Sequence, residues 1–360
     1  MINLASQRPA PSATRTGAGS QHQSIQGAPT QMRMLAVIGL GVLGTAAIAA
    51  SLLLGSNTIA AADVWASLAG RGEQSVNIVV LDQRLPRTVV VICVGAALGV
   101  AGALMQALTR NPLADPGILG INAGSSLAVV LAVVIGGAMG IVTYIWWAFL
   151  GAIFASIGVY ILGGVGRQYV TPARLTLAGV VFSMAISAFV QTVLLSNQQA
   201  FNEFRYWATG SVEGRGWDVA ATISGFILVG IMLAFLAAPA LNALALGDDT
   251  GLALGVKIAR TRTIVMVAVT LLCGAATAAV GPIMFVGLAV PYLARAIGGV
   301  DQRKVIPLCL LAAPTFLLCA DVLARIVVAP LEIQTGIMSA LVGAPIFIAV
   351  VRSYNLETSS

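Results

Sequence analysis

The acidic pair Asp248-Asp249 is the first feature of the sequence that could support chemistry. Paired carboxylates bind divalent cations in enzymes that act on phosphate or prenyl groups, but a cation site needs further oxygen ligands. The other acidic residues expected on the same side of the chain, Asp115 and Asp301, do not complete a cluster. The pair fits better the first turn of a short helix, because carboxylates there accept hydrogen bonds from unpaired backbone N–H groups.

Other reactive side chains are few and scattered. The histidine His22 lies in a polar stretch without neighbouring ligands. A zinc site or a disulfide framework would require cysteines in loops at short, regular spacings, whereas the cysteines here lie inside apolar runs and are expected to be buried thiols. These cysteines are Cys93, Cys273, Cys309 and Cys319. We therefore expect no catalytic residue, no metal site and no cofactor, which disfavours a membrane-embedded enzyme.

The sequence also lacks a loop that could hold the phosphates of ATP. The stretch from Gly251 to Lys257 comes nearest to the pattern G-x-x-x-x-G-K-[ST], but no serine or threonine follows the lysine. The chain is therefore not expected to hydrolyse ATP. Any work that it performs has to be driven by a partner subunit or by an ion gradient.

The composition is that of a membrane protein. Of the 360 residues, 58% are hydrophobic and 9% are charged, whereas soluble domains carry roughly 25% charged residues. Apolar runs of ~20 residues, the length that crosses a bilayer, recur from Met34 almost to the C-terminus. The expected spans are 34–54, 86–108, 116–136, 144–164, 174–195, 219–240, 261–280, 282–298, 305–327 and 335–351. The sequence therefore predicts an all-α polytopic membrane protein with about ten transmembrane helices.

The segments outside the spans are short. Residues 1–33 are rich in Gln, Ser, Gly and Pro and are expected to form a disordered cytoplasmic tail. Residues 34–352 form the expected transmembrane domain, and residues 353–360 a short cytoplasmic tail. One outer loop, from about Asn197 to Asp218, is rich in aromatic residues and predicts a short helix at the membrane interface.

The charges of the loops indicate the orientation. The net charge of +6 at pH 7 comes from basic residues in short loops and not from a continuous basic patch, so nucleic-acid binding is not expected. Basic residues gather on the side of the N-terminus: Arg8, Arg15, Arg33, Arg110, Arg167, Arg174, Lys257, Arg260, Arg262, Arg303, Lys304 and Arg352. The opposite loops hold Asp63, Glu73, Asp82, Glu203, Glu213, Asp218 and Glu332. Because cytoplasmic loops carry the excess of Lys and Arg, both termini are predicted to lie on the cytoplasmic side of the cell membrane.

Two arginines run against this pattern. Arg84 and Arg87, in the sequence RLPRT, are placed at the outer end of the second span, where basic residues are disfavoured. Between them, Pro86 suits the first turn of a helix. The long side chains could simply extend to the interface, or they could form a cationic docking point for an acidic partner surface, with Arg325 as a third member. Asp321 shares a helix face with Arg325 and is expected to pair with it.

The main cytoplasmic loop, residues 243–255, contains the acidic pair. Asp248 and Asp249 begin its predicted short helix, and Gly255 fits the left-handed position after the helix end. Leucines flanking the pair leave an apolar face, so the helix is predicted to enter a groove of a partner or to lie on the lipid surface. The residues assigned to this partner contact are Leu244, Leu246, Gly247, Asp248, Asp249, Leu252, Leu254 and Gly255.

The link between the second and third spans, residues 106–117, is expected to be tight and non-helical, because two X-Pro pairs disfavour the helical backbone. The residues of this break are Asn111, Pro112, Asp115, Pro116 and Gly117. Three glycines on the preceding helix, Gly95, Gly99 and Gly102, permit close helix packing.

Together these segments resemble the FecCD family of permeases, which import iron siderophores, haem and vitamin B12. The similar stretches are RLPRT, VGAALGVAGALMQALTRNPLADPGILGINAGSSLAVV, LNALALGDDTGLALGV, AVGPIMFVGLAVPYLAR, LLCADVLAR and TGIMSALVGAPIFI, which follow one another over roughly residues 50–352.

The resemblance implies a permease of type II ATP-binding-cassette (ABC) importers, with ten helices per subunit and a dimer formed with a second copy or a related permease. Two ATPase subunits would bind on the cytoplasmic side, and a periplasmic or lipoprotein substrate-binding protein on the outer side. Arg84, Arg87 and Arg325 would pair with acidic residues of the binding protein. The loop 243–255 would enter the ATPase.

The substrate implied by the resemblance is a ferric siderophore, with vitamin B12 and haem as alternatives. The spans 174–195 and 335–351 would line the central path. Tyr292 stands where the family usually has histidine, which leaves the role of that position open. A carrier driven by an ion gradient is disfavoured, because it would need ionisable groups deep in its spans, where this sequence has essentially none. A channel would leave the apolar loop helix unexplained.

Overall fold

The computed structural model describes residues 30–137, 140–163 and 172–357, and within these ranges every regular element is a helix. Seven helical stretches are long and apolar enough to cross a membrane. They are α1 (Thr30–Leu53), the stretch Gln74–Thr109 that ends in α4 (Leu85–Thr109), α6 (Ile141–Leu162), α7 (Pro172–Ser196), α9 (Trp217–Ala245), α11 (Ile258–Val280) and α13 (Gln302–Ile326). Three further apolar helices, α5 (Ile121–Gly136), α12 (Val286–Gly298) and α14 (Thr335–Glu357), occupy the remaining positions of the ten expected spans.

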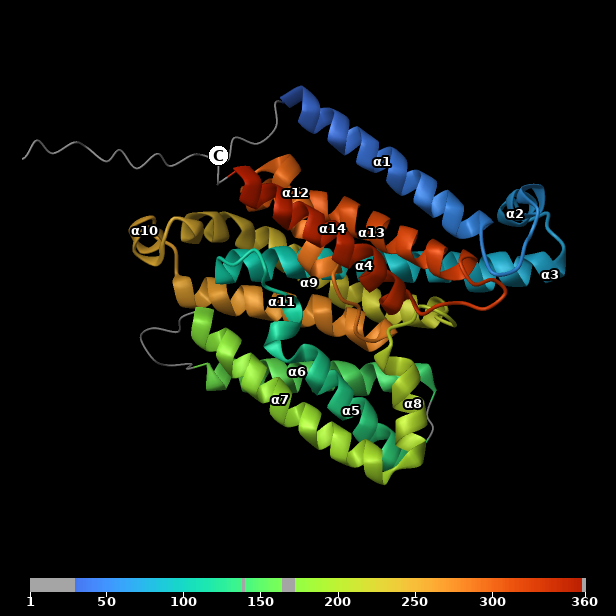
Figure 1. Ribbon diagram of the computed structural model, residues 1–360, viewed down its shortest axis with the longest axis horizontal. Coiled ribbons are helices and arrows are strands. Elements are labelled where there is room, and N and C mark those ends of the chain that lie inside the picture. Colours follow the sequence, from blue (N-terminus) through green and yellow to red (C-terminus); the bar gives the residue numbers. More distant parts are fainter. Residues whose placement is uncertain (1–29, 138–139, 164–171, 358–360) are drawn as a thin grey trace, which may run out of the picture.

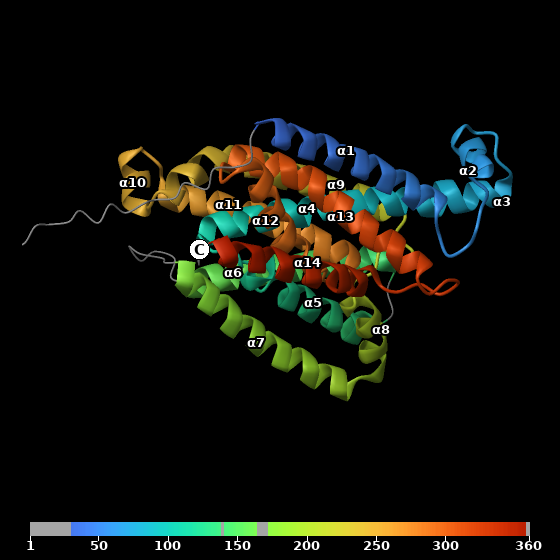
Figure 2. The ribbon, with the colours of Figure 1, turned by 45° about the horizontal axis from the view of Figure 1, so that its top comes forward.

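Short elements lie at the two ends of the bundle. At one end are α2 (Ala61–Leu68), α3 (Gln74–Asn77) and the interfacial helix expected from the aromatic loop, α8 (Gln198–Ala208). At the other end is α10 (Asp248–Ala253). The described chain begins in α1 and ends in α14 on the side of α10 (Figures 1 and 2). Both ends of the described chain therefore lie on one side, as an even number of spans requires.

Helix α4 is the centre of the bundle (Figure 2). In the stretch that contains it, 83% of an 18-residue apolar window is buried, the largest such share among the seven long stretches of the described chain. Glycines let other backbones approach it closely: Gly95 lies against Pro314 of α13, and Gly102 lies against the carbonyl of Gly287 on α12. The packing role expected for Gly95, Gly99 and Gly102 is thus confirmed, because a side chain at any of them would overlap a neighbouring helix.

Two of the expected spans become helical later than predicted. The span 116–136 opens with a short 3₁₀-helix, η2 (Pro116–Leu119), and turns into α5 only after Gly120, whose φ is 72°. The span 282–298 becomes helical at Val286, after Phe285 at φ 69°. A left-handed residue interrupts the helical backbone, so each break shortens the helix that follows it.

Pro86 lies in the first turn of α4, as expected, but the second span begins earlier than Pro86. The helical stretch is continuous from Gln74, and Pro86 follows a π-helical segment, η1 (Ile78–Arg84). Inside a regular α-helix the proline ring would clash with the carbonyl four residues earlier. The π-helical turn shifts the hydrogen-bond register at that point, which accommodates the proline and lets the helix continue outward.

The boundaries of the expected tails also differ from the structure. Residues 30–33, assigned to the N-terminal tail, form the first turn of α1. Residues 353–357, assigned to the C-terminal tail, continue α14 to Glu357. Residues 1–29 and 358–360, which make up the rest of both tails, lie outside the described residues.

Substitution Gly102→Ala is expected to destabilise the bundle, because the added Cβ would overlap the backbone of Gly287 and neither backbone can yield cheaply. Overpacking of this kind costs about 1–3 kcal/mol. The measurement is the apparent Tm of the detergent-solubilised protein.

The matched control is Gly39→Ala on α1, where a Cβ meets nothing within 4 Å. This variant should keep the wild-type Tm. An equal effect of the two substitutions would show that the close contact between α4 and α12 is unimportant for stability.

Candidate functional site

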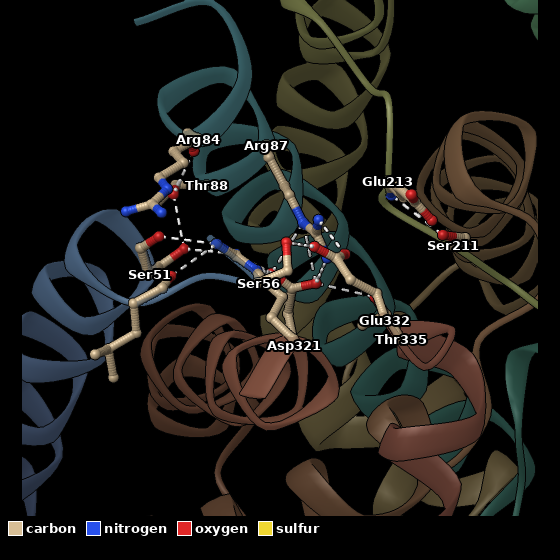
Figure 3. A network of polar contacts seen from close by, with 12 residues as sticks. Ser51, Ser56, Arg84, Arg87, Thr88, Ser211, Glu213, Asp321, Glu332 and Thr335 are labelled. Carbon is tan, nitrogen blue, oxygen red and sulfur yellow. Dashed lines mark hydrogen bonds and ion pairs between the residues drawn. The ribbon is translucent and has the colours of Figure 1, made fainter. Parts of the chain in front are cut away.

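A buried carboxylate organises the outer end of the bundle (Figure 3). Asp321 on α13 is fully buried, and it accepts hydrogen bonds from Arg87 at 2.7 Å and from Thr335 at 3.0 Å. It also forms an ion pair with Arg325, one helical turn further along α13. The pair expected from the sequence is thus present, and the carboxylate is shared between two guanidinium groups. Because buried charges are tolerated only when they are paired, this site joins α4, α13 and the start of α14.

A second carboxylate completes the site on its outer side. Glu332 lies in the link between α13 and α14 and accepts from Nη1 of Arg87 at 2.7 Å. It also accepts from the hydroxyl of Ser56 at 3.0 Å, so it connects this link with the segment after α1 (Figure 3). Arg87 therefore contacts two carboxylates at once, which satisfies both sides of its planar guanidinium group.

The other two arginines hold the C-terminal end of α1. Nη1 of Arg84 donates to the carbonyls of Leu52 and Leu53 at 2.8 and 3.0 Å. Nη1 of Arg325 donates to the carbonyl of Ser51 at 2.9 Å. The last carbonyls of a helix have no partner within the helix and carry partial negative charge, so two cations at this end stabilise it. We name Arg84, Arg87, Asp321, Arg325 and Glu332 the outer network.

The structure thus brings Arg84, Arg87 and Arg325 together, as the docking hypothesis requires. Their residues are only 6%, 9% and 2% exposed. The alternative that Arg84 and Arg87 simply extend to the membrane interface is wrong, because both are engaged by acceptors inside the protein. The contact of these arginines with a binding protein stays a prediction.

A cavity of about 460 Å³ opens next to the outer network. All three arginines line it, together with Asp82 of η1 and with Glu213 and Arg215 of the loop between α8 and α9. The sequence reasoning missed Arg215, although the available signal was the same as for Arg84: a basic residue in an outer loop. Its Nε atom is buried without a hydrogen-bond partner in the described structure. Burial lowers the pKa of Arg215 to about 10, so the guanidinium stays charged at neutral pH.

The predicted loop helix is present at the opposite end as α10. It begins at Asp248, and Gly255 follows it at φ 80°. Leu246, Leu252 and Leu254 are 68%, 57% and 62% exposed, so the expected apolar face lies open. Leu244 differs from this expectation: it is buried at the end of α9, where it packs on Gly251 and supports the helix.

The two aspartates of the loop differ in their surroundings. Asp248 forms ion pairs with Arg110, directly after α4, and with Arg262 of α11. Asp249 is exposed, and no ion pair involving it occurs in the described part of the chain. Gly247, which precedes both, has a φ of 118° and lets the chain turn from α9 into α10. We name Arg110, Asp248 and Arg262 the inner clamp.

The link between α4 and α5 has the tight turns expected from its proline pairs. Side-chain oxygens stabilise both: Asn111 accepts from the N–H of Leu113 at 2.9 Å, and Asp115 accepts from the N–H of Gly117 at 2.7 Å. These bonds fix the backbone on either side of Pro112 and Pro116, which lack an N–H of their own.

Gln106, near the end of α4, serves α12. Its amide donates to the carbonyl of Leu288 at 3.1 Å and to that of Gly287 at 3.4 Å. Pro291 lies inside α12 and cannot donate to the carbonyl of Gly287 four residues earlier. Gln106 therefore supplies the hydrogen bond that the proline removes. Tyr292, the position where the family resemblance fails, is the next residue of α12 and is half-buried.

Apolar side chains cover the two helices that the resemblance assigns to the central path. On α7, Leu177, Met184 and Leu195 are 65%, 69% and 89% exposed. On α14, Leu341 is 60% exposed and lines an apolar cavity of about 590 Å³ with Met284. Among the described residues, no three His, Cys, Asp or Glu side chains are grouped in a way that could hold a metal ion.

Comparison with known sequences gives concordant results. The model of the FecCD transport family matches residues 43–353. The ferric enterobactin transport system permease protein FepD of Escherichia coli is 42% identical over 328 residues, which cover 91% of this chain and 98% of FepD. The probable siderophore transport system permease protein YfiZ of Bacillus subtilis is 36% identical over 85% of this chain and 92% of its own length.

Comparison with solved structures supports the same fold. An ABC transporter of the metal-chelate type, in an inward-facing conformation, superposes with a TM-score of 0.79. The match has 26% sequence identity and covers 89% of this chain and 99% of the other. The all-helical bundle described above is therefore that of an ABC transporter permease.

Substitution Asp321→Asn is expected to be strongly destabilising, because it leaves Arg87 and Arg325 as buried cations without their shared counter-ion. Removing one partner of a buried ion pair costs about 3–5 kcal/mol. The apparent Tm in detergent and the yield of membrane-inserted protein measure the loss. Asp63→Asn in α2, an exposed carboxylate at the same end of the bundle, is the control and should leave both unchanged. Similar behaviour of the two variants would contradict the central role of Asp321.

Proposed function

The chain belongs to the FecCD transport family, and on that premise we propose that it is the membrane-spanning permease subunit of an ABC importer that carries a ferric siderophore across the cytoplasmic membrane. One observation carries the choice of substrate. The 42% identity to the ferric enterobactin permease extends over nearly the whole of both chains. Vitamin B12 and haem remain the alternatives that the family allows.

The energy for transport comes from separate ATPase subunits, two per complex. The exposed apolar face of α10 supports this proposal, because three leucines at 57–68% exposure need a partner groove. The two glycines with positive φ at its ends, Gly247 and Gly255, let this helix project from the bundle. ATP-driven closure of the ATPase dimer would displace α10, and the permease halves would then rock to expose the path alternately to each side.

A second permease, either another copy or a related chain, completes the path. The exposed apolar faces of α7 and α14 support this role, because a path for a large chelate needs few fixed polar contacts. An ion gradient is a poor alternative source of energy. The buried acid in the spans, Asp321, is held between two guanidinium groups and is thus unsuited to carrying a proton.

A substrate-binding protein docks on the outer face, at the cavity beside the outer network. Arg84, Arg87 and Arg325 line this cavity and would attract acidic residues of the binding protein. Reversing their charge is a poor test, because the same residues hold the bundle together. Arg215 lines the cavity and has no ion pair within 4 Å among the described residues, so it offers a test that spares the network.

Uptake of radiolabelled ferric enterobactin under iron limitation tests the proposed substrate. A strain lacking this gene should lose uptake, and the intact gene should restore it. The same strains are given radiolabelled cobalamin and haem in parallel. Normal ferric enterobactin uptake together with loss of cobalamin or haem uptake would overturn the siderophore assignment but not the assignment to the family.

Substitution Arg215→Glu is expected to weaken docking of the binding protein about tenfold, equivalent to about 1.4 kcal/mol, because a carboxylate replaces the cation that meets the acidic partner surface. Binding to the reconstituted complex is measured at low and high salt. Arg71→Glu, an exposed arginine of another outer loop, makes the same change of charge and should have little effect. If the two variants bind equally well, the cavity is not the docking site.

A further inference from the structure

We propose that Asp248 is a positioning residue that fastens α10 to the inner ends of α4 and α11, and that α4 transmits displacement of α10 to the outer network. The inference rests on the proposed function, since it assigns a route between the ATPase contact and the docking face. It concerns the inner clamp of Arg110, Asp248 and Arg262, which no part of the import mechanism described above requires.

The first observation is how the carboxylate of Asp248 is used. Oδ1 accepts from Nη2 of Arg110, and Oδ2 accepts from Nη2 of Arg262 at 2.8 Å. Each oxygen thus connects α10 with a different membrane-spanning helix. The side chain of Asp248 is 42% exposed, so water screens both pairs in the isolated subunit. An ATPase seated on α10 would exclude water, and the same ion pairs would then be stronger.

The second observation is the backbone of Arg110. Its φ and ψ are 52° and 31°, and Phe285 is the other non-glycine residue with positive φ in the described ranges. Glycine is the usual residue at this left-handed position after a helix, because other side chains are strained there. Arginine is therefore unfavourable for the backbone at this place. Local structure therefore does not explain why an arginine stands at position 110, whereas the contact of its guanidinium with Asp248 does.

The third observation is that α4 joins both sets of charges. Arg87 in the outer network and Arg110 in the inner clamp are 110 − 87 = 23 residues apart on α4 and its C-cap, which is roughly 35 Å at ~1.5 Å per residue. Between them, Gly95 and Gly102 pack directly on the backbones of α13 and α12. A helix packed this closely moves as a rigid body, so displacement at its inner end reaches the outer end.

A purely local role for Asp248 is the competing explanation, since an acidic residue stabilises the first turn of any helix. Asp249 occupies the same turn and can make that local contribution without an ion pair. The double contact with two other helices is specific to Asp248. Local helix stabilisation therefore does not account for it.

The test uses four variants in the complete complex with ATPase and binding protein, reconstituted in lipid nanodiscs and liposomes. Arg110→Gly suits the left-handed backbone and removes the ion pair, so the variant should assemble and keep the wild-type Tm. Asp248→Asn removes both pairs, and Asp248→Glu preserves the charge. Arg260→Gln is the matched control for the clamp, because Arg260 is exposed near the start of α11, two residues before Arg262, and forms no ion pair in the described structure.

Arg110→Gly is expected to retain ATP hydrolysis but to transport at least about fivefold less ferric enterobactin per ATP, the lower end of typical coupling between sites. Asp248→Asn should show the same loss of transport per ATP hydrolysed. The change in binding-protein affinity on adding ATP should also shrink, and by reciprocity the change in ATP affinity on adding the binding protein should shrink by the same factor. Arg260→Gln should behave as wild type, and Asp248→Glu, which keeps the charge, should lose less transport per ATP than Asp248→Asn. Normal transport per ATP in both Arg110→Gly and Asp248→Asn would overturn the proposal.

Hydrogen exchange on the assembled complex without nucleotide, where the ATPase covers the clamp, separates this proposal from the proposed function. The amides of residues 248–253 should exchange faster in Arg110→Gly and Asp248→Asn than in wild type or Arg260→Gln. Unchanged exchange would show that the clamp does not fasten α10, whatever the complex transports. Faster exchange in a complex whose wild type imports no siderophore would retain the fastening and reject the substrate.

Discussion

The structure depends on one ion-paired carboxylate buried at the outer end of the bundle. Asp321 neutralises Arg325 and shares Arg87 with Glu332, and without it Arg325 would stay buried while losing its ion-pair partner, at a cost of several kcal/mol. Arg325 can then extend to the C-terminal carbonyls of α1, which attaches this peripheral helix to the core. Charged side chains therefore define where α1, α4, α13 and the start of α14 meet. Apolar contacts alone would let these helices slide past one another.

Close backbone packing fixes the relative positions of the helices in the middle of the bundle, as ion pairs do at its outer end. In a bilayer, burial of apolar surface gives little preference for one helix contact over another, because lipid is equally apolar. Glycines such as Gly102 create the preference instead, since dispersion contacts between backbones fall off steeply when a side chain intervenes. A proline also favours one particular helix contact. Pro291 leaves the carbonyl of Gly287 on α12 without its helical N–H donor, and the side-chain amide of Gln106 on α4 donates to that carbonyl instead.

The spans, their sides and the arginines of the outer network were predictable from the sequence, because each follows from a local rule about hydropathy or charge. Arg84 was conspicuous as a cation on the outer side, and Asp321 lies one helical turn before Arg325. Beyond the pair of Asp321 and Arg325, the partners of these residues were not predictable. That Arg84 donates to carbonyls of α1 depends on tertiary packing across 32 positions of the chain. The π-helical turn before Pro86 and the left-handed Phe285 also escaped prediction, since both reflect strain that only the packed bundle imposes.

The two ends of α4 differ in a way that suits a transporter. At the outer end the charges are buried and multiply bonded within the chain, so they hold one another in place and move together with α4. At the inner end Arg110 and Asp248 are about two-fifths exposed, and ion pairs of that kind contribute little on their own. Their strength depends on what covers them. A helix that must respond to a partner is best attached by interactions that the partner strengthens. The ion pairs of the inner clamp meet this condition, whereas the buried ion pairs of the outer network are already strong within the chain.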